Sequence, residues 1–206
     1  MNQMSAFRKI FISIIKKRIR AGSGSDLGFL KRREMNKRVT DLRKIFLKTP
    51  FLIVGGVATR LYMPERMTLD LDVLISKECE IQAEEELLLA GCEKRGILSA
   101  GGSNWLLPDE TNMDLLSFDY SWVAEAIASP VIASDNLPYI ALEYFIIMKL
   151  HSSRAQDIAD ITRMLGSLED PELAKIREKA GKYIPDDLED IESLIALGRL
   201  EYSQKS

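Results

Sequence analysis

The stretch "RMTLDLDVLI", residues 66–75, is a short apolar run that carries two aspartates two positions apart. Side chains of a β-strand alternate between its two faces, so Thr68, Asp70 and Asp72 would share one face of a strand. Neighbouring carboxylates repel each other and resist burial. This stretch alone is compatible with the solvated face of an edge strand, or with a divalent cation held between the carboxylates.

The segment before this strand predicts a turn with exposed backbone amides. "FLIV", residues 51–54, is an apolar run typical of a short buried strand, and Gly55 and Gly56 end it. "VATRLYM", residues 57–63, predicts a short helix that closes at Pro64. Glycines at the start of a helix let bare N–H groups approach a phosphate closely, although two glycines after a strand are common in ordinary turns.

A third acidic residue lies in a later strand. "NWLL" at 104–107 and "MDLLSF" at 113–118 flank the turn-rich "PDETN", which predicts a β-hairpin over 104–118. Asp114 is the only acidic side chain of its apolar strand. It is either an exposed strand residue or, if the strands are neighbours, the third carboxylate of a site for Mg²⁺ and a triphosphate. Two ions roughly 4 Å apart would activate an attacking oxygen and neutralise a leaving pyrophosphate.

Helical patterning dominates the rest of the chain. We expect helices over 26–48, 79–90, 139–154 and 155–168, and again beyond Asp170. In the first of these, the expected buried stripe is Met35, Val39, Leu42 and Phe46. The predicted fold class is α/β (α+β), with a mixed β-sheet flanked by helices in residues 26–135 and a helical C-terminal region in 136–206.

Charge is distributed unevenly along the chain. Residues 1–48 contain 14 Lys or Arg and 3 acidic residues, whereas the remainder contains 14 basic and 28 acidic residues. Apolar side chains recur at helical spacing over 7–19, and "AGSGS" at 21–25 is typical of a flexible linker. We therefore predict a basic amphipathic arm over residues 1–25. Its partner could be nucleic acid, an anionic membrane surface, another protein or the acidic body of this chain.

Several other classes of protein are not indicated. The apolar runs fall short of a membrane span, so we expect no transmembrane segment, and the N-terminus does not resemble a signal peptide. Cys79 and Cys92 have neither metal-ligand spacing nor the pattern of a disulfide framework. We therefore expect a cytoplasmic protein.

The glycine pair, the Asp-x-Asp strand and the later acidic residue together resemble the DNA polymerase β-type nucleotidyltransferase superfamily. Its signature is glycine followed by glycine or serine, a spacer, Asp-x-Asp, and a third acidic residue on a later strand. The segments "GGVATRLY", "RMTLDLD" and "KLHSSRAQDIADI" are similar to those of small bacterial nucleotidyltransferases related to the AbiEii toxin. The resemblance covers roughly residues 35–165 by motif order.

This resemblance implies a nucleotidyltransferase-like fold and a Mg²⁺-dependent (or Mn²⁺-dependent) enzyme that moves a nucleoside monophosphate from an NTP to an acceptor hydroxyl. RNA or protein is the favoured acceptor over a small molecule. A toxin–antitoxin setting with a partner protein from a neighbouring gene is also implied. A non-catalytic nucleotide-binding or antitoxin-like partner protein is the alternative, and a nucleic-acid-binding module that acts through the basic arm is a third.

Residue roles follow from the same resemblance. Gly55 and Gly56 would cradle the nucleotide phosphates. Asp70, Asp72 and Asp114 would bind the metal and form the catalytic set, and Asp114 would assist deprotonation of the acceptor hydroxyl.

Arg66, Thr68 and Lys149 would complete the nucleotide-binding set. Arg66 and Thr68 lie at the mouth of the aspartate strand, whereas Lys149 would reach the triphosphate from the C-terminal helices. From the residues alone, Lys149 is equally compatible with a lysine that snorkels at the edge of the core.

The acidic residues after Lys149 have a more ordinary interpretation. Asp157 and Asp160 lie three apart on one expected helix, and we expect surface ion pairs with Arg154 and Arg163. The roles of Arg154, Asp157 and His151 in any site stay open.

Overall fold

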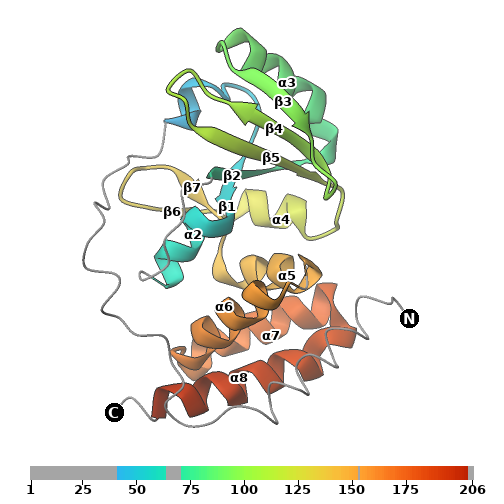
Figure 1. Cartoon of the computed structure of the whole chain (residues 1–206). Helices are drawn as coiled ribbons and strands as arrows, with labels where there is room; N and C mark the ends of the chain where they lie inside the picture. The colour runs from blue at the N-terminus through green and yellow to red at the C-terminus, as the bar shows by residue number, and fades with distance from the viewer. Residues whose placement is uncertain (1–40, 64–70, 153, 204–206) are drawn as a thin grey trace, which may run out of the picture. The chain divides into compact units, whose positions relative to one another are not determined.

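The computed structural model describes residues 41–63, 71–152 and 154–203 of the chain (Figure 1). The described residues form two compact units. The sheet unit runs up to Ala141 and the helical unit begins at Leu142. The predicted arm over residues 1–25 lies outside the described residues.

A mixed β-sheet organises the sheet unit, as the sequence predicts. Its strands are β1 (Leu52–Val54), β2 (Leu71–Ser76), β3 (Glu93–Ile97), β4 (Gly102–Leu106), β5 (Asn112–Phe118), β6 (Val131–Ile132) and β7 (Pro138–Tyr139). Their order across the sheet is β3-β4-β5-β2-β1-β7-β6. Strand β2 pairs in parallel with β5 and antiparallel with β1, so the aspartate strand is central in the sheet.

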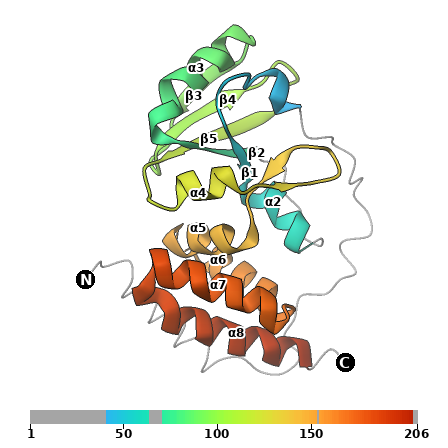
Figure 2. The same ribbon diagram turned by 180° about the vertical axis from the view of Figure 1, so that it is seen from behind.

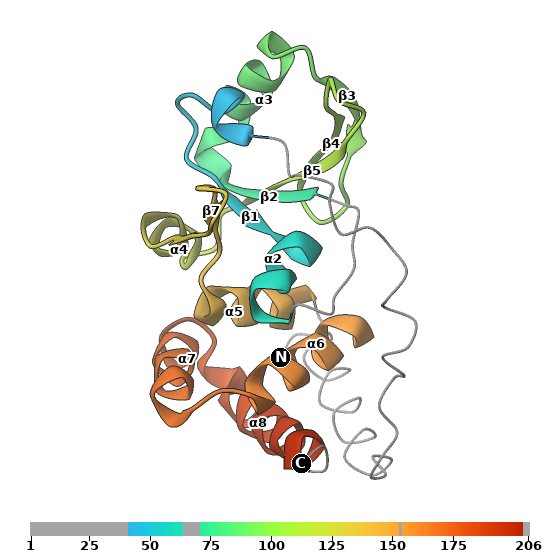
Figure 3. The same cartoon turned by 90° about the vertical axis from the view of Figure 1, so that its left-hand side faces the viewer.

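One face of this sheet is covered and the other is more open. Helices α3 (Glu80–Leu89) and α4 (Val123–Ala128) lie on the same side of the strands (Figures 2 and 3). On that side, alternate side chains are fully buried, among them Val73, Trp105 and Leu115. Side chains that alternate with these, at the positions of Asp72, Asn104 and Asp114, are half-buried. Period-two alternation therefore separates the core from the polar positions.

The first described segment, residues 41–50, differs from its expected element. In place of the end of a helix over 26–48, the chain forms only a 3₁₀ turn, η2 (Leu42–Lys44), and then bends. The carboxylate of Glu86 accepts hydrogen bonds from the three backbone N–H groups of residues 47–49, at 3.0, 2.7 and 3.2 Å. These N–H groups are therefore unavailable to a helical ladder.

The structure confirms one predicted hairpin and one predicted helix of the sheet unit, and it adds strands that the sequence pattern did not predict. The hairpin predicted over 104–118 is present as β4 and β5, and the helix predicted over 79–90 is α3. Tyr139 was expected to begin a helix over 139–154. It lies instead in β7, because it pairs in parallel with Ile53 of β1. Strand β3 was not predicted, since all of its residues are exposed and three of the five are charged.

The helical unit confirms the predicted helical C-terminal half. It contains α5 (Leu142–Ser152), α6 (Ala155–Gly166), α7 (Asp170–Tyr183), the 3₁₀ turn η4 (Pro185–Asp187) and α8 (Leu188–Ser203). Helix α6 packs on α8 so closely that a Cβ atom on Gly198 would lie 2.2 Å from the Thr162 carbonyl oxygen. Among the described helices, none combines the length and the apolar character that crossing a membrane requires.

Candidate active site

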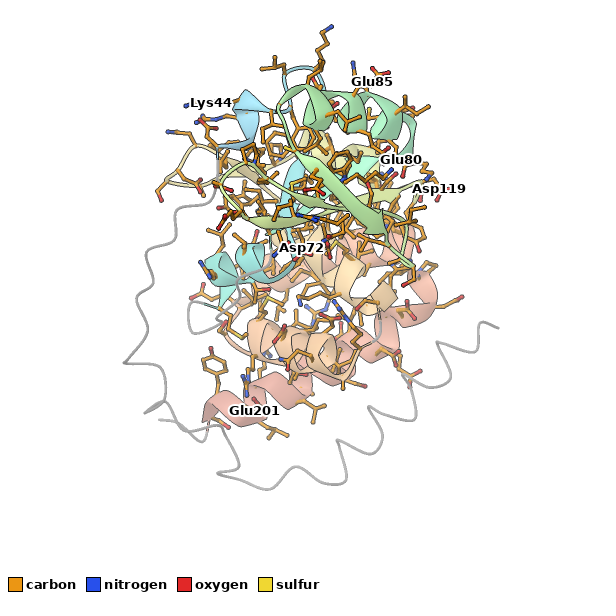
Figure 4. All side chains as sticks on the ribbon, turned by 45° about the horizontal axis from the view of Figure 1, so that its top comes forward. Lys44, Asp72, Glu80, Glu85, Asp119 and Glu201 are labelled. Carbon is orange, nitrogen blue, oxygen red and sulfur yellow. The ribbon has the colours of Figure 1, made fainter. Side chains whose placement is uncertain are left out.

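Strand β1 leads directly into helix α2 (Gly55–Tyr62), and this turn contacts Asp72. Gly55 has φ +59°, and a Cβ atom added to it would lie 1.8 Å from Oδ2 of Asp72. The N–H of Gly56 points to the same oxygen at a long 3.4 Å. Figure 4 labels Asp72 beside the start of α2. Both the left-handed backbone and the lack of space require glycine at position 55.

Asp72 and Asp114 lie opposite each other on neighbouring strands. The parallel register of β2 and β5 pairs these two residues directly. Partners in parallel strands point to the same face, with backbones about 4.8 Å apart. The two carboxylates that the sequence analysis assigned to one site are thus brought together, and we call Asp72 and Asp114 the in-register pair.

Asn104 extends this arrangement on the far side of Asp114. It pairs with Asp114 across the β4–β5 hairpin, and its Nδ2 donates a hydrogen bond of 2.6 Å to Oδ1 of Asp114. Sequence analysis did not single out Asn104. The sequence pattern located the hairpin but not its register, which the structure shows: the Leu107 N–H bonds the Thr111 carbonyl at 2.9 Å, and counting back from that turn places 104 opposite 114.

The described donors fit a hard divalent cation. Mg²⁺ prefers oxygen ligands and is usually held by one or two carboxylates together with substrate phosphates. The in-register pair supplies two such carboxylates, and within the described residues Oδ2 of Asp114 accepts no hydrogen bond. Asp70, Arg66 and Thr68 lie outside the described residues. Without Asp70, the described ranges contain no cluster of three metal-ligating acidic, histidine or cysteine side chains.

Lys149 lies in the helical unit, where it is 5% exposed. Its Nζ atom donates to Oδ1 of Asp157 at 2.8 Å and to Oδ2 of Asp160 at 3.0 Å. The two aspartates are 3% and 0% exposed, so the expectation that they lie on the protein surface is wrong for both. Amphipathic packing of α6 turns them inward, and the buried ammonium balances their charge.

Further contacts surround this buried cluster. Arg154 Nε contacts Asp157 at 2.8 Å, as expected, and the Ser152 hydroxyl donates to the same carboxylate. Burial alone would raise the pKa of Asp157, but the charge and hydrogen bond of Lys149 and the bonds from Ser152 and Arg154 hold it below its usual range. Nδ1 of His151 lies 3.0 Å from the Ile147 carbonyl oxygen of its own helix. A triphosphate contact from Lys149 stays a prediction.

In the comparisons with known proteins, only solved structures match this chain. No protein-family model and no curated protein matches the chain. Among solved structures, a solution structure of the antibiotic-resistance factor ANT(2'')-Ia matches with 19% identity and a TM-score of 0.43, over 79% of this chain and 91% of that one. A crystal structure of ANT(2'')-Ia with adenylyl-2''-tobramycin matches with 20% identity and the same TM-score, over 78% and 96%. The likeness is weak at these values, so the functional interpretation rests on this chain's own residues.

Proposed function

We propose that this protein is a Mg²⁺-dependent (or Mn²⁺-dependent) nucleotidyltransferase that moves a nucleoside monophosphate from an NTP to an acceptor hydroxyl. The observation that carries the proposal is the in-register pair, held on a central strand against a helix-initiating glycine turn. Two like charges on adjacent strands repel, and a cation between them offsets that repulsion. A solvated edge strand does not account for Asp72, because β2 lies between β1 and β5.

Asp114, Asp72 and the start of α2 have different roles in the proposed reaction. The acceptor oxygen forms a bond to the α-phosphorus, the bond from that phosphorus to the bridging oxygen of the β-phosphate breaks, and pyrophosphate leaves. Asp114, whose Oδ2 accepts no bond among the described residues, takes the hydroxyl proton. The bound cation supplies charge neutralisation for the phosphates. Asp72 is positioned by the turn at Gly55, and the start of α2 offers backbone N–H groups to the triphosphate.

The acceptor and the setting are finer parts of the same proposal. The basic N-terminal segment favours RNA or an acidic protein surface over a small molecule. The motif resemblance favours a toxin-like activity with a partner protein from a neighbouring gene. The free thiols of Cys79 and Cys92 suit a cytoplasmic location, where NTPs are available.

Pyrophosphate release is the direct test. Each of the four NTPs is supplied with Mg²⁺ and a panel of acceptors that includes tRNA, total RNA, candidate partner proteins and an aminoglycoside. Wild-type protein should release pyrophosphate with at least one pair, and Asp72→Asn or Asp114→Asn should lower the rate by several orders of magnitude with little change in melting temperature. Release that is unaffected by both substitutions contradicts the proposal.

A non-catalytic nucleotide-binding or antitoxin-like partner is the second candidate. It predicts that an NTP with metal raises the melting temperature by mass action while no acceptor supports turnover. The same titration in the double variant Asp70→Asn, Asp72→Asn should lose the metal-dependent rise under either function. Turnover therefore separates the two candidates, and the thermal shift tests the site that they share.

A further inference from the structure

Asp114 is held in place by one neutral donor. Within the described residues its only hydrogen bond is the 2.6 Å contact from Asn104 Nδ2 to Oδ1. An ionised carboxylate only accepts hydrogen bonds, so the amide presents its NH₂ group to it. The other oxygen of Asp114, Oδ2, is left for another contact.

The direction of this contact follows from the strand order. β5 lies between β4, which carries Asn104, and β2, which carries Asp72. A bond that draws Oδ1 toward β4 fixes the rotation of the carboxylate. Oδ2, which accepts no bond among the described residues, is therefore directed away from β4, and β2 with Asp72 is the neighbouring strand on that side.

The neutrality of the donor distinguishes Asp114 from carboxylates that lysines bond, such as Glu84 and Asp157. Glu84 is bonded by Lys94 at 2.6 Å, and Asp157 by Lys149 at 2.8 Å. A lysine or arginine at position 104 would form such an ion pair and compete with any cation for Asp114. An asparagine orients the carboxylate and leaves its negative charge uncompensated.

We propose that Asn104 is a positioning residue that orients Asp114 for cation binding and proton transfer. This inference rests on the proposed nucleotidyltransferase function and assigns a role that neither the motif nor the comparisons give. Partners that orient the ligands of a metal typically contribute 10- to 100-fold to metal affinity or activity. Loss of the Asn104 donor should therefore raise the Mn²⁺ requirement by about 10- to 100-fold.

Two donor-free variants and one donor-retaining variant test this role. Asn104→Val suits a half-buried strand position and removes the amide, and Asn104→Ala removes it without adding bulk. Asn104→Gln keeps an NH₂ group on a longer side chain. Asn112→Val is the matched control, because Asn112 is an asparagine on the same face of β5 that makes no carboxylate contact among the described residues.

The readout is thermal unfolding of the full chain with a fixed mixture of the four NTPs and increasing Mn²⁺. Both donor-free variants should need about 10- to 100-fold more Mn²⁺ for the half-maximal rise in melting temperature. For Asn104→Gln, this Mn²⁺ concentration should lie between the values for the donor-free variants and for wild type. For Asn112→Val, it should match wild type. Without ligand, all four variants should melt close to the wild-type temperature.

Two outcomes separate this inference from the proposed function. If wild type responds to Mn²⁺ and Asp114→Asn does not, but Asn104→Val behaves like Asn112→Val, the role of Asn104 is overturned and the proposed function stands. If Asp114→Asn responds like wild type, the metal site itself is wrong. An increase in the Mn²⁺ requirement that is equal in Asn104→Val and Asn104→Ala and smaller in Asn104→Gln supports the positioning role. A change in side-chain size or shape without loss of the donor would not produce that order.

Discussion

Alanine at position 55 would force Asp72 away from the turn between β1 and α2. The added Cβ atom would lie 1.8 Å from Oδ2, 2.4 Å from Cγ and 2.8 Å from Cβ of Asp72. Non-bonded Cβ contacts do not fall below 3.0 Å, so the carboxylate has to retreat by about 1 Å or more. Asp72 then no longer lies beside Asp114 as the in-register pair requires.

The expected effects on stability and on function differ in size. A left-handed conformation costs a non-glycine residue about 1–2 kcal/mol, and overpacking adds about 1–3 kcal/mol. Misplacement of a catalytic group by about 1 Å costs about 100-fold in rate. Gly91→Ala is the matched control, because Gly91 has φ +78° but its added Cβ would meet only the Pro108 Cγ, at 4.0 Å.

Urea unfolding and the metal titration measure the two effects separately. Both variants should lose about 1–2 kcal/mol of unfolding free energy from the backbone, with a further loss in Gly55→Ala. Only Gly55→Ala should lose the Mn²⁺-dependent rise in melting temperature and about 100-fold in pyrophosphate release. If Gly55→Ala retains the metal response of Gly91→Ala, the close approach of the turn to Asp72 has no part in the site.

Three other predictions concern the helical unit and the arm. Gly198→Ala should lower the unfolding free energy in urea by about 1–3 kcal/mol. Gly181→Ala, whose added Cβ would make only an ordinary contact with Leu188 Cδ1 at 3.9 Å, should raise it by about 0.5–1 kcal/mol. Lys149→Met should cost about 3–5 kcal/mol at neutral pH because it leaves buried carboxylates uncompensated. The pKa of Asp157 is lowered in the fold, so its stabilising contribution is complete above the ordinary carboxylate range and is lost as pH falls through the folded pKa. The stability deficit of Lys149→Met relative to wild type should therefore be largest near neutral pH and should shrink as urea unfolding is repeated at lower pH. Deletion of residues 1–25 should preserve the metal-dependent thermal shift but weaken tRNA binding in an electrophoretic assay, and high salt should mimic the deletion in the full chain.

Local patterns predicted much of the architecture. Apolar periodicity located the helices of the C-terminal half, and the turn-rich "PDETN" located the β4–β5 hairpin, because both signals depend on residues close together in the chain. The same approach failed over residues 41–48, where a helical pattern gave way to a 3₁₀ turn. The cause is Glu86, a distant residue whose carboxylate binds the backbone N–H groups that follow.

The candidate site was likewise predicted in part from the sequence and decided in part by the tertiary structure. The sequence by itself determined which side chains share a face of a strand, and so identified Asp72 and Asp114 as candidate ligands beside a glycine turn. Only the tertiary structure decided that β2 and β5 pair in parallel with these residues opposite each other, and that Asn104 holds the second one. It also decided that Asp157 and Asp160 are buried against Lys149 and not exposed on a helix surface. Strand register and helix orientation depend on contacts between residues far apart in the chain, which alternation along one segment does not encode.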